Sequence, residues 1–523
     1  METTYRDLTC GDARPTHEGM ELALAGWVHR RRDLGQLIFL DLRDRYGITQ
    51  VVIDARESPA AHAVASGVRS EFVVRVRGTL ARRLAGTENP KLATGEVELR
   101  AASVEVLSAA KTPPFPINEP DAEVDEALRF KYRYLDLRRE ALQKRLMTRS
   151  RLVHAVREVH HASGFVEIET PILIKATPEG ARDFIVPSRL QPGNVYALPQ
   201  SPQQLKQLLM VSGFDRYFQI ARCMRDEDMR GDRQPEFTQL DLEMSFVAEA
   251  DVMAFVERMV IEVSRSVVPE RSIAEIPFPR MTYRDATDRF GSDKPDVRYG
   301  MELHDLAEVA GGSGFKVFDD ALAAGGVVFG FGAPGMSGAS RSQIDELTEM
   351  AKRFGAKGLV WMAVEPEGTV RSPIGKFLGE GRAEAIAAAA GASPGDLVLI
   401  VAGDDIHSQE VLGRMRVELA TRLELADPHV LSYVWVYEFP MYQWDADGNR
   451  WDATHNPFSG VHPDDEALLV TTSGDPSRPS PQDPAGRARA LQYDIALNGW
   501  ELGGGSIRIH KADLLSRSFE LMG

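Results

Sequence analysis

The stretch Phe218-Gln-Ile-Ala-Arg-Cys-Met-Arg-Asp-Glu-Asp-Met-Arg-Gly-Asp-Arg-Gln-Pro-Glu-Phe-Thr-Gln239 decides how the largest part of this chain folds. A strand-like apolar run from Tyr217 to Ile220 precedes Arg225, and a second strand-like run opens at Glu236. The loop between the runs is too rich in Arg, Asp and Gly to lie in a core. The pattern predicts a β-hairpin with Arg225 at the end of its first strand. An arginine there can hold a phosphate or carboxylate through paired hydrogen bonds; the alternative is a solvated hairpin with surface ion pairs.

Length and composition describe a large globular protein. At 523 residues the chain is too long for one core, and we expect roughly three or four domains. The N-terminus has no apolar signal region, and no apolar run approaches the roughly 18 residues that span a membrane. We therefore expect a cytoplasmic protein with no membrane partner. Cys10 and Cys223 have no paired spacing, which argues against a zinc site or a disulfide framework. The net charge of −16 argues against nonspecific coating of nucleic acid, but binding needs only a local positive face.

Residues 1–107 are predicted to form an all-β module, because short β-rich runs alternate with turns that carry Gly and Asp. The runs are Leu22–Val28, Leu37–Leu42, Thr49–Ile53, Phe72–Val76, Val97–Leu99 and Val104–Leu107. Such a module suits a small closed barrel such as the OB-fold, which often binds single-stranded nucleic acid. Phe39 follows the basic cluster Arg30 to Arg32, and an exposed aromatic beside cations suits base stacking worth about 1–3 kcal/mol. From composition alone, Phe39 fits a core strand position equally well.

The segment after this module is too proline-dense for a helix or an inner strand, with Pro113, Pro114, Pro116 and Pro120 close together. The apolar spacing from Leu142 to Ser163 then predicts an amphipathic helix. Gly164-Phe-Val-Glu-Ile-Glu-Thr-Pro171 has the pattern of a strand stopped by proline.

Downstream, Ala197-Leu-Pro-Gln-Ser-Pro-Gln-Gln-Leu-Lys206 begins as a polar loop and becomes a helix. Gln203 and Lys206 stand three residues apart, so both can project from one side of its first turn. Near the end of the chain, Asp494 and Glu501 precede Gly503-Gly-Gly505, which lets the backbone approach a ligand closely. Paired carboxylates could hold Mg²⁺, which prefers oxygen ligands; the alternative is a Gly-rich bend with surface charges.

These segments resemble, in order, the motifs of class II aminoacyl-tRNA synthetases, in the form carried by bacterial aspartyl-tRNA synthetases. The 218–239 hairpin is similar to the second signature motif, and the helix, strand and proline before it to the first, which builds a dimer interface in the family. The resemblance implies an α+β multidomain protein with an N-terminal OB-fold and an antiparallel-sheet catalytic domain. It places an OB-fold anticodon-binding domain at 1–107, a linker at 108–140, a first catalytic part at 141–290, an inserted α+β domain at 291–430 and a second catalytic part at 431–523. We expect no catalytic motif in 291–430, whose Gly-rich run lacks the Lys-Ser/Thr of a P-loop.

The resemblance also implies roles for residues of the catalytic part. Arg225 is the expected catalytic residue. Expected aspartate contacts are Glu179, Ser201, Gln203, Lys206, Arg225, His455 and Arg508. Expected ATP contacts are Arg225, Asp226, Glu227, Gln234 and Glu501, with Mg²⁺ on Asp494 and Glu501 and Ser506 nearby. Asn456 stands where the family has a second histidine.

In the barrel, the resemblance implies anticodon contacts. Phe39 would stack on a base, Gln50 would read a base edge, and Arg32 would hold the backbone, with Asn89 and Glu96 as weaker candidates. Leu34 occupies a position where relatives that also charge asparagine tRNA can carry histidine. Leucine there favours aspartate tRNA alone.

The implied activity is ligation of L-aspartate to aspartate tRNA in two steps that use ATP and Mg²⁺, by a homodimer. A third motif, whose arginine stacks on adenine, would follow beyond Gly523, so we expect residues 1–523 alone to lack exchange activity and to aggregate. Two alternatives stay open: a catalytically impaired tRNA-binding relative, and an asparaginyl-tRNA synthetase. The pair of Lys206 and Arg508, which suits a second carboxylate, favours the aspartate enzyme over the asparagine one.

Overall fold

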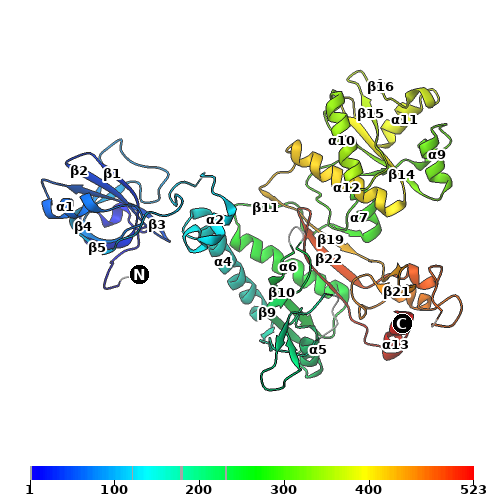
Figure 1. The fold of residues 1–523 in the computed structure, drawn as a ribbon, viewed down its shortest axis with the longest axis horizontal. Helices are drawn as coiled ribbons and strands as arrows, with labels where there is room; N and C mark the ends of the chain where they lie inside the picture. Colours follow the sequence, from blue (N-terminus) through cyan, green and yellow to red (C-terminus); the bar gives the residue numbers. More distant parts are fainter. Residues whose placement is uncertain (1–2, 121, 177–180, 230–232, 477, 523) are drawn as a thin grey trace. The chain divides into compact units, whose positions relative to one another are not determined.

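The computed structural model describes residues 3–120, 122–176, 181–229, 233–476 and 478–522 (Figure 1). The chain divides into two compact units, Met1–Leu152 and Val153–Gly523. Among the described residues, no helix is both long enough and apolar enough to cross a membrane.

The first unit is built on a closed barrel with the strand order β1-β2-β3-β5-β4. Its elements are η1 (Pro15–His17), β1 (Glu21–Asp33), β2 (Leu37–Asp44), β3 (Gly47–Asp54), α1 (Pro59–Gly67), β4 (Val73–Arg82) and β5 (Val97–Ser108). Alternate residues of each strand, such as Leu22 and Leu24 of β1, fill one apolar core. The runs expected at 97–99 and 104–107 are one strand, because the residues between them continue the ladder with β4 through a bulge at Arg77 and Gly78.

Short helices follow the barrel: α2 (Glu126–Lys131), α3 (Arg133–Asp136) and the start of α4 (Glu140–Ala162). The proline-dense segment before α2 contains neither helix nor strand among its described residues, as expected from its composition. Asp136 is fully buried and accepts hydrogen bonds from Arg129 and Arg133, which fixes the turn between α2 and α4.

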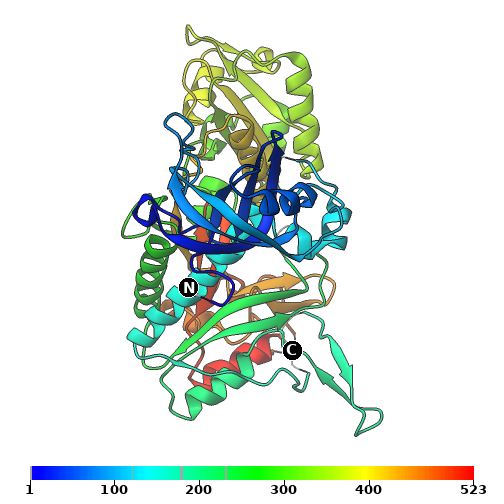
Figure 2. The same cartoon turned by 90° about the vertical axis from the view of Figure 1, so that its left-hand side faces the viewer.

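The second unit contains the predicted hairpin, β9 (Arg216–Met224) and β10 (Glu236–Met244), which pair antiparallel along their whole lengths (Figure 2). The strand expected at 164–171 is reduced to β6 (Val166–Glu167), which pairs parallel with β9. A second sheet has the order β12-β19-β22-β23. Its strands are β12 (Arg280–Thr282), β19 (Tyr433–Tyr437), β22 (Gln492–Leu497) and β23 (Trp500–Ser506). Helix α6 (Glu249–Val267), α4 and this second sheet share one apolar core.

Helix α7 (Tyr283–Phe290) leads into a five-stranded sheet with the order β13-β14-β17-β15-β16. Its strands are β13 (His304–Asp305), β14 (Val327–Ala333), β15 (Val360–Val364), β16 (Val370–Arg371) and β17 (Leu397–Gly403). Its helices are α8 (Ala307–Ala310), α9 (Lys316–Ala323), α10 (Arg341–Arg353), η2 (Gly375–Phe377), α11 (Arg382–Ala389) and α12 (Asp405–Arg422). Successive residues of β17, Val398 and Leu399, lie in different core clusters, so helices cover both faces of this sheet.

Smaller elements complete the second unit. They are β7 (Ile185–Pro187), β8 (Val195–Ala197), α5 (Gln203–Val211), β11 (Ser272–Ile273), β18 (Val430–Leu431), β20 (Tyr442–Asp445), β21 (Arg450–Ala453), η3 (Pro463–Leu468), η4 (Pro484–Arg487) and α13 (Ala512–Met522). Helix α13 packs with β20 and β21 around a separate apolar cluster.

Candidate functional site

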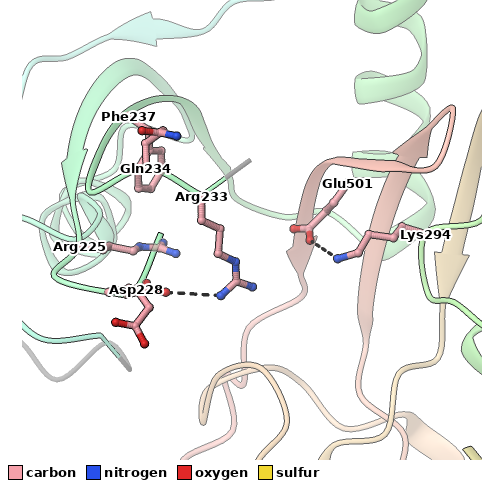
Figure 3. A pocket seen from close by; sticks show the side chains of 8 residues that line it. Arg225, Asp228, Arg233, Gln234, Phe237, Lys294 and Glu501 are labelled. Atoms are coloured by element: carbon pink, nitrogen blue, oxygen red, sulfur yellow. Dashed lines mark hydrogen bonds and ion pairs between the residues drawn. The ribbon is translucent and has the colours of Figure 1, made fainter. Parts of the chain in front are cut away.

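The hairpin loop and the second sheet enclose a polar cavity of about 310 Å³ (Figure 3). Its lining residues are Arg225, Glu227, Asp228, Arg233, Gln234, Phe237, Lys294 and Glu501. Figure 3 shows the hairpin residues on one side, facing Lys294 and Glu501 on the other. Arg225, Glu227, Gln234 and Glu501 were expected here from the sequence, and the structure brings them together.

Arg225 lies directly after β9, where the hairpin leaves its ladder. Its backbone N–H donates to the carbonyl of Pro235 at 2.9 Å, and its guanidinium lies 5.2 Å from the ring centre of Phe237. Across the loop, Arg233 pairs with Glu227 at 3.4 Å. The guanidinium of Arg225 is therefore held against an aromatic face and is not paired with a carboxylate among the described residues, which leaves its charge available to an anionic ligand.

Asp494 and Glu501 stand on neighbouring strands at one end of the second sheet. Asp494 on β22 is opposite Gly504 on β23, and a Cβ at residue 504 would lie 2.1 Å from Asp494 Oδ1. The glycine is therefore required by the close approach of this carboxylate. Burial, followed by repulsion from Glu501 and Asp293, raises the pKa of Asp494 to about 7. Its Oδ1 is buried without a hydrogen-bond partner.

Lys294 was missed by the sequence reasoning, which placed no catalytic motif in 291–430. Its Nζ lies 3.6 Å from Glu501, and it lines the cavity. Lys294 lies at the start of this region and lines the cavity because the segment after α7 turns back onto the β22–β23 hairpin before the chain enters the five-stranded sheet. The run Gly291-Ser-Asp-Lys-Pro-Asp296 was the available signal, since it has the turn-rich composition of a loop.

Arg508 and Gln203 meet although they are far apart in the chain. Arg508 Nη2 donates to Gln203 Oε1 at 3.0 Å and Nη1 donates to Ser506 Oγ at 2.7 Å. The guanidinium also lies 4.8 Å from the ring centre of Phe458. Arg508 Nε and Gln203 Nε2 are buried without partners. These donors point to a ligand that supplies oxygen acceptors.

Lys206, which was expected to face the side-chain carboxylate of aspartate together with Arg508, is paired with carboxylates of the chain itself. Its Nζ lies 2.7 Å from Asp241 and 3.2 Å from Glu243, both on β10. Lys206 and Asp241 are 6% and 4% exposed. Sequence reasoning missed these carboxylates because their alternation along a strand carries no sign of a buried partner. Burial raises the pKa of Asp241, while Lys206 opposes that rise.

The remaining expected residues are held by fewer contacts. His455 still meets solvent, and partial burial with the charges of Arg508 and Arg225 lowers its pKa, while Glu501 opposes this. Ser201 Oγ accepts from the backbone of Gln203 at 3.2 Å. Asp226 is exposed and is bonded through its backbone to Arg182. Asn456 Oδ1 accepts from Ser459 Oγ at 3.0 Å, and the Ser459 and Ser506 hydroxyl oxygens lie 2.8 Å apart. Glu179 lies outside the described residues.

The barrel carries a second candidate site, suited to nucleic acid. Arg32 and Phe39 are paired across β1 and β2, with the guanidinium 5.5 Å from the ring centre. Arg32 also donates to Gln50 at 3.4 Å, so these three expected residues form one cluster. Asn89 and Glu96 lie in the loop between β4 and β5, where Glu96 faces Arg82 at 3.8 Å. Leu34 is 73% exposed at the tip of the β1–β2 hairpin.

Charged groups around Gln50 were not expected from the sequence. Gln50 donates to Glu98 at 3.4 Å, and burial raises the pKa of Glu98 while nearby Arg100 and Arg83 oppose the rise. Burial also raises the pKa of Asp41. Alternation along β2 and β5 places these side chains on the face that carries Phe39. The residue types themselves did not indicate that these carboxylates would be partly buried beside Gln50.

Family models match nearly the whole chain. Residues 125–523 match the class II tRNA synthetases of the D, K and N group, and residues 22–107 match an OB-fold nucleic-acid-binding domain. A protein of Moorella thermoacetica named aspartate–tRNA(Asp/Asn) ligase is 52% identical over 99% of this chain and 84% of its own length. A protein of the same name from Symbiobacterium thermophilum is 50% identical over 99% of this chain and 86% of its own length.

Solved structures share the fold. Asparaginyl-tRNA synthetase from Pyrococcus horikoshii covers 98% of this chain and 86% of that one, with a TM-score of 0.57 at 19% identity. A putative aspartyl-tRNA synthetase from Leishmania major covers 99% of this chain and 85% of that one, with a TM-score of 0.58 at 17% identity. The expected family, the OB-fold and the catalytic fold are confirmed: the chain belongs to the class II tRNA synthetases of the D, K and N group.

Proposed function

We propose that the protein is an aspartate–tRNA ligase. The observation that carries the proposal is the polar cavity, which sets Arg225 on the hairpin opposite Lys294 and Glu501 (Figure 3). Relatives at about half identity over nearly the whole chain are named aspartate–tRNA(Asp/Asn) ligases. The asparaginyl alternative has structural neighbours at 19% identity, which share the fold alone.

The reaction has two steps. An α-carboxylate oxygen of aspartate attacks the α-phosphorus of ATP, forming aspartyl-adenylate and releasing pyrophosphate. A ribose hydroxyl of the terminal adenosine of the tRNA then attacks the activated carbonyl, forming the ester and releasing AMP. The protein supplies no nucleophile, so its contribution is positioning and charge stabilisation. Arg225 binds the reacting carboxylate and phosphate, and Lys294 on the opposite wall binds further phosphate charge.

Arg508 and Gln203 are proposed to recognise the side-chain carboxylate of aspartate. Their buried unpaired donors support this role, since a carboxylate would supply the missing acceptors. Lys206 is proposed to support the same pocket indirectly, because Asp241 and Glu243 already balance its charge. Glu179 and Ser201 stay predictions for the amino group and pocket wall.

Asp494 and Glu501 are proposed to hold Mg²⁺ with ATP. The residues fit: Asp494 Oδ1 is buried without a partner, and burial, followed by repulsion from Glu501 and Asp293, raises the pKa of Asp494, so a bound cation would offset both causes. Among the described residues, no group of three or more His, Cys, Asp and Glu could hold a metal by itself. This agrees with an ion that takes its other oxygens from phosphate and water. When bound, Mg²⁺ would neutralise phosphate charge.

The barrel cluster of Arg32, Phe39 and Gln50 is proposed to bind the anticodon. The guanidinium of Arg32 lies over the Phe39 ring, 5.5 Å from its centre, so a base that stacks on this ring has a cation close to its backbone. Relatives are named for both aspartate and asparagine tRNA, whereas Leu34 favours aspartate tRNA alone. We keep aspartate tRNA as the proposed substrate and treat asparagine tRNA as the question for experiment.

A homodimer formed through the first motif is also proposed. Apolar side chains that follow α4 are exposed in the described chain, with Val166 at 44%, Ile172 at 48% and Leu173 at 54%. A second copy would cover such a surface. Sedimentation equilibrium tests the dimer. Because a tRNA ligase acts where translation takes place, we propose a cytoplasmic location.

The experiment expresses the protein from its full gene and measures ATP–pyrophosphate exchange with each amino acid, then charging of aspartate and asparagine tRNAs. Exchange that depends on aspartate and not on asparagine supports the proposal. Exchange driven by asparagine would refute it. Charging of asparagine tRNA with aspartate would overturn the interpretation of Leu34 while leaving the ligase assignment intact.

A further inference from the structure

Arg416, on helix α12, is a buried arginine bonded to main-chain carbonyls. It is 1% exposed. Its Nη2 donates to the carbonyls of Asp296, Tyr299 and Gly300 at 2.8 to 3.0 Å, and its Nε donates to that of Met301 at 3.1 Å. No described carboxylate pairs with it. Burial lowers its pKa, and the nearby Tyr299, Asp296 and Glu302 oppose this.

The segment that Arg416 holds, residues 292–301, also forms a wall of the proposed ATP site. Asp296 lies against the turn between β22 and β23, where a Cβ at Gly499 would stand 3.2 Å from Asp296 Cβ. Two residues earlier, Lys294 reaches Glu501 in the cavity. Arg298 closes the segment on itself by pairing with Asp296 at 2.7 Å. A shift of this segment would therefore move Lys294 away from Glu501.

Helix α12 is itself fixed against the catalytic part. Gly413 on α12 meets Gly291 so closely that a Cβ at residue 413 would lie 2.5 Å from the Gly291 carbonyl oxygen. Gln409 donates to Asp288 on α7 at 2.7 Å. The helix is also covered on its other side by the core of the five-stranded sheet. It thus offers a rigid base from which Arg416 can act.

We propose that Arg416 is a positioning residue of the nucleotide site, through which the inserted region sets the place of Lys294. The catalytic consequence of this positioning rests on the proposed function, whereas the positioning of the 292–301 segment by Arg416 does not. A guanidinium is required because its fixed fork reaches several carbonyls at once. A lysine at 416 keeps the charge but presents donors on a single nitrogen, so it restores the arrangement only in part.

The experiment compares Arg416→Met with Arg414→Met, an exposed arginine on the same helix. The first readout is hydrogen exchange of the peptide that covers 292–301, which needs no activity. Arg416→Met should speed its exchange by about tenfold or more, because four hydrogen bonds to this segment are lost. Arg414→Met should leave it unchanged. Unchanged exchange in Arg416→Met would overturn the proposal.

The second readout is steady-state ATP–pyrophosphate exchange by the protein expressed from its full gene. Arg416→Met should raise the KM for ATP by about tenfold and the KM for aspartate by less than about twofold, with Arg416→Lys between. Lys294→Met should have a similar effect, and Arg416→Met added to Lys294→Met should change KM for ATP little further, because the two act on one contact. Equal changes in both KM values, or additive effects, would overturn the proposal.

If Arg416→Met fails to fold, Arg416→Lys carries the same comparisons. If the unmodified protein shows no exchange with aspartate or any other amino acid, the proposed function fails. The hydrogen-exchange comparison then still decides whether Arg416 positions the 292–301 segment.

Discussion

Replacing Lys206 by methionine separates the structural from the catalytic contribution of the buried charges in the second unit. Lys206 and Asp241 are 6% and 4% exposed, and Nζ lies 2.7 Å from Asp241 and 3.2 Å from Glu243. Breaking a buried ion pair from one side costs about 3–5 kcal/mol, because it leaves an uncompensated charge. We expect Lys206→Met to lower the local stability of the β9–β10 hairpin by about this amount.

The loss should depend on pH with a definite sign. Burial already raises the pKa of Asp241, and Lys206 is the main influence holding it down. Without Lys206 the pKa rises further, so the carboxyl takes up a proton in the folded protein more readily than in the unfolded one. Stability of the variant should therefore increase as the pH falls through the raised pKa of Asp241. The deficit should be larger at pH 8 than at pH 5.

The assay must report on one region, because a multidomain chain does not unfold in a single two-state step. Native-state hydrogen exchange of peptides within 216–244 meets this need, with barrel peptides within 21–108 as an internal reference. Arg222→Met is the matched control, since Arg222 pairs with Glu236 on the same hairpin but both are exposed. Its effect should stay below about 1 kcal/mol.

The double variant Lys206→Met, Asp241→Asn should recover part of the lost hairpin stability, because only the charge of Glu243 then stays uncompensated. An unchanged hairpin in Lys206→Met, or an equal loss in the barrel peptides, would refute the buried-pair reasoning. If the hairpin keeps its stability while the KM for aspartate rises, Lys206 acts as a substrate contact alone.

Three further outcomes are expected. Phe39→Ala should weaken binding of aspartate tRNA by about 1–3 kcal/mol in a filter-binding titration and leave aspartate-dependent exchange intact; loss of exchange as well would contradict a role confined to the barrel. Arg508→Leu should raise the KM for aspartate by orders of magnitude and that for ATP little, because Gln203 and the substrate carboxylate lose their shared partner; unchanged aspartate kinetics would sink the assignment. His29 has a pKa lowered to about 4, mainly by burial and next by Arg43, so the unfolded chain binds a proton between pH 6.5 and pH 4 that the folded barrel does not. Barrel stability should fall as the pH drops through that window, and His29→Gln should abolish this fall in hydrogen exchange of barrel peptides; an equal fall in the variant would assign the effect to other groups.

The sequence was sufficient where local pattern decides the structure. The two strand-like runs around the 225–235 loop form the β9–β10 hairpin because both have strand composition and a polar loop joins them. The β-rich runs expected at 22–28 and 37–42 lie in β1 and β2 of the closed barrel. Pattern alone left two possibilities for Phe39, a core residue or a stacking platform. The family resemblance, now confirmed, favoured the stacking platform, and this role stays a prediction.

The sequence was insufficient where partners are distant in the chain. Lys294 reaches Glu501 only because α7, α12 and the β22–β23 turn pack together, and no local period near residue 294 encodes that packing. The partners of Lys206 were missed for the same reason. Asp241 and Glu243 share one face of β10, but a pair of acidic strand residues more often faces water, so only the position of α5 shows that they are buried with a lysine.

The charged groups around the candidate site differ in how far the chain itself compensates them. Lys206 is already compensated by carboxylates, so a ligand could gain little from it without competing with them. Arg508 Nε, Gln203 Nε2 and Asp494 Oδ1 are instead buried without partners. An unmet buried donor or acceptor costs about 1–3 kcal/mol, and a ligand that meets it recovers this energy on binding. The two donors call for an anion and the acceptor for a cation, which is the division expected of an amino-acid pocket beside a metal–nucleotide site.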